Sequence, residues 1–141
     1  MIRGTTPTDR LVEAIATRIR RMDLLAWQQV AAWAEESELS FEDLRLLLAL
    51  AVKMDDGPAP ISELAELAGL PLDVAYPSIH RLRGRGYLVE EGRQYSLSEQ
   101  GRELVARLDA VHREGIQAYV DQLPAEERRL LETAFGMESS E

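Results

Sequence analysis

Apolar residues recur at spacings of three and four over the first quarter of the chain, which is the spacing of one face of an α-helix. Thr8 is a typical capping residue, so we predict a helix from Asp9 to about Glu36. Its apolar stripe consists of Leu11, Ile15, Ile19, Met22, Ala26, Val30 and Ala34. Because so long a helix cannot bury its stripe within a small monomer, we expect Leu11, Ile15 and Ile19 to contact another subunit. The alternative is a kink near Asp23 and packing entirely within the monomer.

Three shorter helices are predicted in the middle of the chain. Ser40 and Asp43 have the spacing of a capping box, which predicts a helix over about 41–53. Residues 55–60 include two prolines and a glycine and predict a turn, after which Ser62 caps a short helix over 63–68. Asp73 is expected to cap a further helix over about 74–84, in which Pro77 lies early enough to be tolerated.

The next segment alternates apolar and polar residues, as strands do. Residues 87–89 and 94–97 predict a β-hairpin joined by residues 90–93, followed by helices over about 99–121 and 125–135. This order is that of a winged helix-turn-helix, residues 40–97, flanked by long dimerisation helices, residues 8–37 and 98–136. The predicted fold class is therefore mostly α with a small β-hairpin wing, within a single domain of residues 1–141.

The composition excludes several kinds of site. The 141-residue chain contains no cysteine and only two histidines, His80 and His112, neither of which lies near other residues at metal-ligand spacing. It also lacks a nucleophile motif and a phosphate-binding glycine loop, so we expect no metal, no cofactor, no catalytic residue and no enzyme activity. There is no apolar run of membrane-spanning length and no signal-peptide core, so we expect a cytoplasmic protein without membrane contact.

Charge is distributed unevenly along the chain. The net charge is −9, and residues 35–73 hold ten acids against Arg45 and Lys53, which argues against DNA binding there. Four arginines nevertheless lie within thirteen positions, at the point where a winged helix meets phosphate: Arg81, Arg83, Arg85 and Arg93. Between residues 80 and 93 only Glu90 and Glu91 oppose them.

The predicted helix over 74–84 carries most of the candidate DNA-binding residues: Tyr76, His80, Arg81 and Arg85, with Arg93 in the hairpin turn. Arg81 projects outward and is suited to guanine or phosphate, the alternative being a solvated arginine paired with a nearby Glu. Tyr76 and His80 are expected either to touch bases or backbone or simply to pack or be exposed. We expect Arg85 to bind phosphate and Arg83 to pair with an acid.

Four segments resemble the MarR family of bacterial transcriptional regulators: Ile61–Leu70, Arg81–Val89, Tyr95–Arg102 and Leu123–Leu131. The resemblance covers the whole chain and implies a C-terminal dimerisation helix with Leu123, Leu130, Leu131 and Phe135. It also implies an effector pocket, for which the candidates are Met22, Trp27, Trp33 and Tyr119, residues that otherwise belong to the core. The stretch Ala75–Leu82 is instead similar to the reading helix of the PadR family, and the wing is shorter and more acidic than MarR wings usually are.

These observations predict a sequence-specific DNA-binding transcriptional regulator. We expect a homodimer that acts as a ligand-responsive repressor, with two reading helices in successive major grooves of a pseudo-palindromic double-stranded site. The expected partners are therefore DNA, a second copy of the chain and a small-molecule effector. The alternative is a winged-helix protein-interaction module that does not bind DNA, which the acidic region, the short wing and Pro77 favour.

Overall fold

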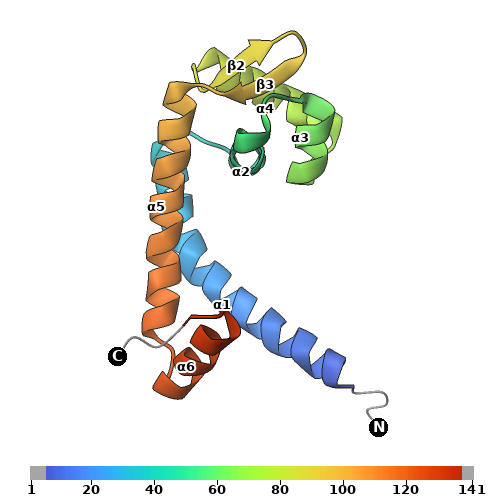
Figure 1. Cartoon of the computed structure of the whole chain (residues 1–141). Helices are drawn as coiled ribbons and strands as arrows, with labels where there is room; N and C mark the ends of the chain where they lie inside the picture. The colour runs from blue at the N-terminus through green and yellow to red at the C-terminus, as the bar shows by residue number, and fades with distance from the viewer. Residues whose placement is uncertain (1–5, 138–141) are drawn as a thin grey trace. The chain divides into compact units, whose positions relative to one another are not determined.

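Helices dominate the computed structural model, which describes residues 6–137. The elements in chain order are α1 Pro7–Glu36, α2 Phe41–Val52, a 3₁₀ turn Met54–Asp56, β1 Ala59–Pro60, α3 Ile61–Ala68, α4 Leu72–Gly84, β2 Leu88–Glu91, β3 Gln94–Leu97, α5 Glu99–Asp121 and α6 Ala125–Ala134 (Figure 1). The predicted class, mostly helical with a small β-hairpin, is confirmed. No helix among the described residues is long and apolar enough to cross a membrane.

The chain forms two compact units, and α1 and α5 each contribute to both. The middle unit is Ala31–Ala110, and the second contains the two chain ends, up to Val30 and from Val111 onward. In the middle unit α2, α3 and α4 pack on one another around side chains that are fully buried: Leu46, Leu47, Leu64, Ile79 and Leu82. The inward-facing spacing of these residues on three amphipathic helices explains why this segment folds as a helical core.

A three-stranded antiparallel sheet in the order β1-β3-β2 completes the middle unit. In the hairpin, Leu88 pairs with Leu97 and Glu91 pairs with Gln94, so only Gly92 and Arg93 form the loop. The predicted four-residue connection was therefore too long. The predicted turn over 55–60 was also wrong at its end, because Ala59 and Pro60 pair with Tyr95 and Gln94 as strand β1.

Three predicted helix starts were late by two residues. Helix α1 begins at Pro7, and its cap is Thr6, whose hydroxyl accepts from the Asp9 N–H while Asp9 accepts from the Thr6 N–H. Helices α3 and α4 begin directly after Pro60 and Pro71, which occupy the capping positions in extended conformation without a side-chain cap. Proline suits this position because its fixed φ leads into the helix and the missing N–H costs nothing there.

In the unit of chain ends, α1 and α5 approach closely and much apolar surface stays uncovered. A Cβ added to Gly115 of α5 would lie 2.2 Å from the Cα of Ala26 in α1, so only glycine fits. Arg18 of α1 pairs with Glu127 of α6 at 2.8 Å. The predicted dimer-contact side chains Leu11, Ile15 and Ile19 are exposed, which speaks against packing of the whole stripe within the monomer.

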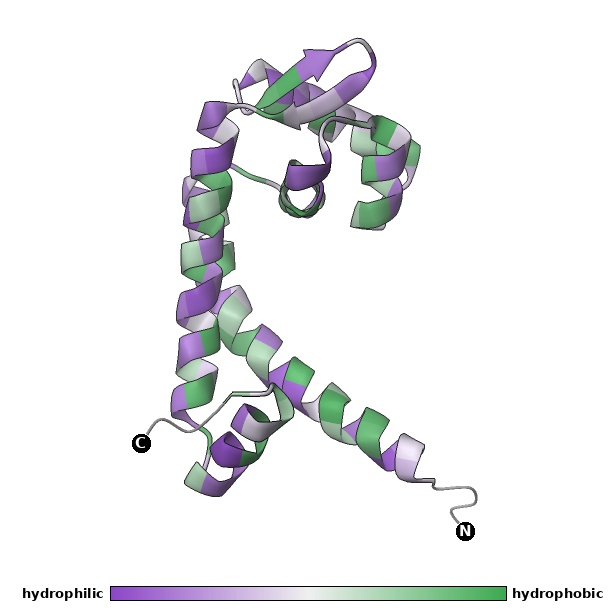
Figure 2. Ribbon diagram, in the orientation of Figure 1, coloured by the Kyte–Doolittle hydropathy of each residue, from purple (hydrophilic) through white to green (hydrophobic). Residues whose placement is uncertain are grey.

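Helix α6 shows the same pattern, since no residue within it is buried. Leu130 is 64% exposed and Phe135, just beyond the helix, is 78% exposed, whereas Leu123 and Leu131 are partly covered. Figure 2 shows hydrophobic positions interspersed with hydrophilic ones along α1 and α6. Apolar surface of this extent on a single chain is typical of a protein–protein contact.

Candidate nucleic-acid interface

Helix α4 has one buried and one open face. Ala75, Ser78, Ile79 and Leu82 are buried against the rest of the middle unit. The opposite face, which carries Tyr76, Pro77, His80 and Arg81, is exposed. Pro77 lies inside the helix, which nevertheless continues to Gly84, as predicted. The second helix of a helix-turn-helix thus presents an accessible surface of the kind that enters the major groove of DNA.

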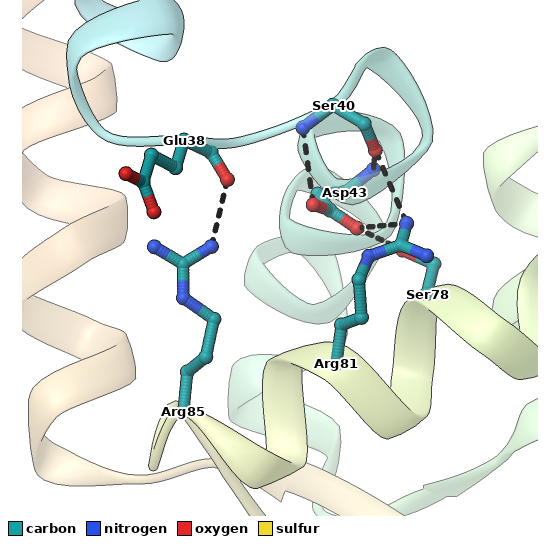
Figure 3. Close-up of polar contacts among 6 residues, drawn as sticks. All are labelled: Glu38, Ser40, Asp43, Ser78, Arg81 and Arg85. Carbon is teal, nitrogen blue, oxygen red and sulfur yellow. Dashed lines mark hydrogen bonds and ion pairs between the residues drawn. The ribbon is translucent and has the colours of Figure 1, made fainter.

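A buried carboxylate on α2 organises one edge of this face. Asp43 is 1% exposed, and its Oδ1 accepts hydrogen bonds from the Ser78 hydroxyl and from Nη2 of Arg81, the latter at 2.9 Å (Figure 3). Its Oδ2 accepts from the Ser40 N–H at 3.0 Å, while the Ser40 hydroxyl accepts from the Asp43 N–H. The predicted capping box is therefore confirmed, and the same carboxylate also holds α4 against α2.

The bonds at Asp43 determine its charge state. Burial raises the pKa of this carboxyl, but the bonds donated by Ser78, the Ser40 backbone and Arg81, together with the positive charge of Arg81, outweigh that effect. The pKa therefore lies below its ordinary value of 3.8. A buried ion in this setting is stable because every donor around it is satisfied.

Arg85 binds the segment that connects α1 to α2. Its Nη1 donates to the Glu38 carbonyl at 2.7 Å and its Nη2 to the Ser37 carbonyl at 2.8 Å (Figure 3 draws the first of these). The guanidinium also lies 5.7 Å from the centre of the Tyr87 ring. Glu38 has a φ of 58°, a left-handed conformation unusual for this residue type, and Arg85 binds its carbonyl. Arg85 thus links the end of α4 to the end of α1, and its binding of phosphate stays a prediction.

A second set of contacts joins α4 to the hairpin. Arg83 pairs with Glu90 of β2, as expected for an arginine turned toward an acid. The Tyr95 hydroxyl of β3 donates to the other oxygen of Glu90 at 3.4 Å. Burial and the nearby charge of Glu90 raise the pKa of Tyr95 above its ordinary value. The pair of Arg83 and Glu90 therefore holds the hairpin to α4, and Tyr95 bonds to the same glutamate within the hairpin.

The tip of the wing is a two-residue loop. Gly92 has a φ of 66°, which glycine adopts readily, and Arg93 follows it with an exposed side chain. The structure places Tyr76, His80, Arg81, Arg85 and Arg93 in one unit, on α4 and the hairpin that follows. Arg93 is therefore the cation of this group that lies in the hairpin loop.

The residues proposed for an effector pocket are distributed over both compact units. Met22, Trp27 and Tyr119 belong to the unit of chain ends, whereas Trp33 belongs to the middle unit. Tyr119 is buried, while Trp27 is 47% exposed. Their role in ligand binding stays a prediction, as does the expected lack of enzyme activity.

Sequence reasoning missed the part played by Asp43 and Ser78. The spacing of Ser40 and Asp43 was a signal, but it indicated only a helix cap. Ser78 lies among apolar residues on the inner face of α4, and a buried serine needs a hydrogen-bond partner. That requirement was the available clue to a polar contact between the two helices.

Several solved structures have a similar architecture. No family model and no curated protein matches the chain. Among solved structures it is similar to Rv1404 from Mycobacterium tuberculosis, with a TM-score of 0.67 and 20% identity over 98% of this chain and 100% of the other. It is also similar to the M. tuberculosis MarR family protein Rv2887 in complex with DNA, with a TM-score of 0.66 and 19% identity over 84% of this chain and 91% of the other.

A third similar structure is BpsR from Bordetella bronchiseptica, with a TM-score of 0.56 and 17% identity over 96% of this chain and 98% of the other. That structure is described as showing the regulation of DNA binding by 6-hydroxynicotinic acid. The likeness in each case extends over most of both chains. The chain therefore has the winged-helix fold of the MarR family of transcriptional regulators.

Proposed function

We propose that this protein is a DNA-binding transcriptional regulator that acts as a homodimer. The observation that carries the proposal is the open face of α4, a helix whose inner face is buried and whose outer face is accessible along its length. The similar Rv2887 structure was solved with DNA, which supports the same use of this fold here. Arg93 at the wing tip supplies a cation for the phosphate backbone or the minor groove.

Dimerisation is proposed from the uncovered apolar residues at the two chain ends. Leu11, Ile15 and Ile19 of α1, with Leu130 and Phe135 at α6, are 45–78% exposed. Burying them against the same residues of a second copy gives a symmetric contact. Two reading helices in such a dimer would address major grooves about 34 Å apart on a pseudo-palindromic site.

We also propose that a small molecule controls DNA binding and that the protein represses transcription. BpsR is described as regulated by 6-hydroxynicotinic acid, and Met22, Trp27, Trp33 and Tyr119 are the candidate contacts in this chain. Repression is the simplest direction, because a dimer on a promoter blocks access without needing a contact to the polymerase. A reporter gene behind a bound site tests this, since expression should rise when the regulator is deleted.

Salt dependence of binding tests the central proposal. Duplexes selected from a random-sequence pool are titrated with the full-length protein at several salt concentrations. Phosphate contact predicts that log affinity falls linearly with log salt, and Arg93→Ala should reduce the slope by about one per subunit. A flat response would contradict phosphate contact. Sedimentation of the protein alone tests the dimer, and Ile15→Glu should yield monomers.

A protein-interaction module is the second candidate. It is favoured by the internal use of Arg81, Arg83 and Arg85, which bind Asp43, Glu90 and backbone carbonyls respectively. Because these three arginines have partners within the protein, fewer cations are available to phosphate than the sequence alone predicted. Failure to enrich any duplex from the random pool, with a folded dimer present, would favour this candidate over DNA binding.

A further inference from the structure

The centre of the exposed face of α4 carries no arginine. At 100° per residue its central residues are Asp73, Pro77, His80 and Gly84, with Tyr76 at the edge of this stripe, and all five are exposed. Arg81 flanks this stripe on one side and Arg83 on the other. The side chains placed to meet base edges therefore include a phenol ring, a proline ring, an imidazole and a carboxylate.

The flanking arginines are committed to other partners. A guanidinium grips guanine through two adjacent N–H groups, and both adjacent pairs, Nη1–Nη2 and Nε–Nη2, include Nη2. In Arg81, Nη2 already donates to Asp43 and, at 3.3 Å, to the Ser40 hydroxyl. Arg83 pairs with Glu90 and lies near the C-terminal end of the helix, away from the N-terminal part that contacts bases in this motif.

The N-terminal part of the stripe has a different chemistry. The Tyr76 side chain is 47% exposed and the Pro77 ring is exposed beside it, so both offer apolar surface to the groove. The only apolar group on the major-groove edge of a base pair is the 5-methyl of thymine. Asp73, one turn earlier, is exposed and accepts from the exocyclic amino group of either cytosine or adenine, so it does not itself select A·T pairs.

We propose that α4 reads A·T pairs through contacts of Tyr76 and Pro77 with thymine methyl groups, and that arginine–guanine pairs have little part in its specificity. This inference rests on the proposed function, because it requires α4 to lie in the major groove. The preferred DNA sequence then follows from three contacts within the protein, because these contacts occupy the arginines. They are Asp43 with Arg81, Glu90 with Arg83, and the carbonyls of Ser37 and Glu38 with Arg85.

Removing single methyl groups from the DNA tests the proposal directly. The best duplex from a random pool is synthesised with each thymine in turn replaced by deoxyuridine, which lacks only the methyl. Binding of the full-length protein is measured by fluorescence anisotropy. At one or two thymines in each half-site we expect affinity to fall about fourfold per methyl.

Variants link the effect to the two residues. With Tyr76→Ala or Pro77→Ala, the penalty for deoxyuridine at the contacted position should shrink to nearly none. Both positions are exposed, and alanine is favourable in a helix, so both variants should fold. Val52→Ala, at an exposed position of α2, is the matched control and should retain the full penalty. Pro77→Arg should shift the selected sites toward guanine.

The outcomes separate this inference from the proposed function. Tight binding that is unaffected at every deoxyuridine position would overturn thymine reading while leaving DNA binding intact. A large loss of affinity on replacing guanine by 7-deazaguanine, which lacks one of the two acceptors that arginine uses, would overturn the minor part assigned to arginine–guanine pairs. If no duplex is bound at all, the proposed function itself fails.

Discussion

Replacing Asp43 by asparagine perturbs the contact between α2 and α4 with the smallest change of shape. The carboxylate accepts from Ser78 and Arg81 at one oxygen and from the Ser40 N–H at the other. An asparagine amide has one oxygen and one NH₂ group. Whichever way it turns, the NH₂ group faces a donor that Asp43 had satisfied.

The expected cost follows from these contacts. A buried donor left without an acceptor costs about 1–3 kcal/mol, and the ion pair with the half-exposed Arg81 adds under about 1 kcal/mol. We therefore expect Asp43→Asn to lower the free energy of unfolding at pH 7 by about 2 kcal/mol. In a chain of this length that corresponds to a fall in Tm of about 8 °C.

The pKa of Asp43 determines how the stability difference between wild type and Asp43→Asn changes with pH. Because the pKa of Asp43 is lowered in the folded protein, its charge stabilises the fold above the unfolded-state value of 3.8. That contribution is lost as pH falls below 3.8 and through the lower folded-state pKa. The difference between wild type and Asp43→Asn should thus be full at neutral pH and should narrow at acidic pH, in urea unfolding followed by circular dichroism.

Glu66→Gln is a matched control, since it removes an exposed carboxylate from α3 in the same unit. It should change the free energy of unfolding by less than about 0.5 kcal/mol at any pH. A wild-type stability retained in Asp43→Asn, or a difference that widens on acidification, would refute the role assigned to this carboxylate.

Three other substitutions test separate contacts. Gly115→Ala should destabilise the protein by about 2 kcal/mol in thermal unfolding, because its Cβ would overlap Ala26, whereas Gly84→Ala has nothing within 4 Å and should be neutral or stabilising. In an ultraviolet pH titration Tyr95 should ionise above the ordinary tyrosine pKa of 10.0, and Tyr95→Phe should remove that late step. Arg85→Ala should lower Tm by several degrees, since two carbonyls lose their donors; an unchanged Tm would show that water replaces the guanidinium without cost.

Long amphipathic helices were the best predicted part of the fold. The limits of α5, Glu99–Asp121, agree with those expected from its apolar spacing and the cap at Ser98. The starts of α3 and α4 were missed because Pro60 and Pro71 replace the usual side-chain cap with a preset backbone angle. Strand β1 was missed because two residues have no recognisable alternation and depend on pairing with a segment 34 or more positions away.

The candidate site was predicted in its position but not in its contacts. The helix and hairpin that carry Tyr76, His80 and Arg93 lie where expected. Arg81 and Asp43 lie 38 positions apart in the sequence, and local sequence patterns do not indicate contacts between residues so far apart. Arg85 binds backbone carbonyls, which every residue possesses, so no residue type in the sequence marks that contact.

The hydrogen bonds of Arg85 to the segment after α1 connect the end of α1 directly to the end of α4. Arg85 is the residue that terminates α4, and the carbonyls it holds belong to Ser37 and Glu38, directly beyond the last residue of α1. Any displacement of those carbonyls would act directly on the end of α4 through these two hydrogen bonds. The Arg85 guanidinium thus connects the two helices directly, by a route that does not pass through the buried leucines of the middle unit.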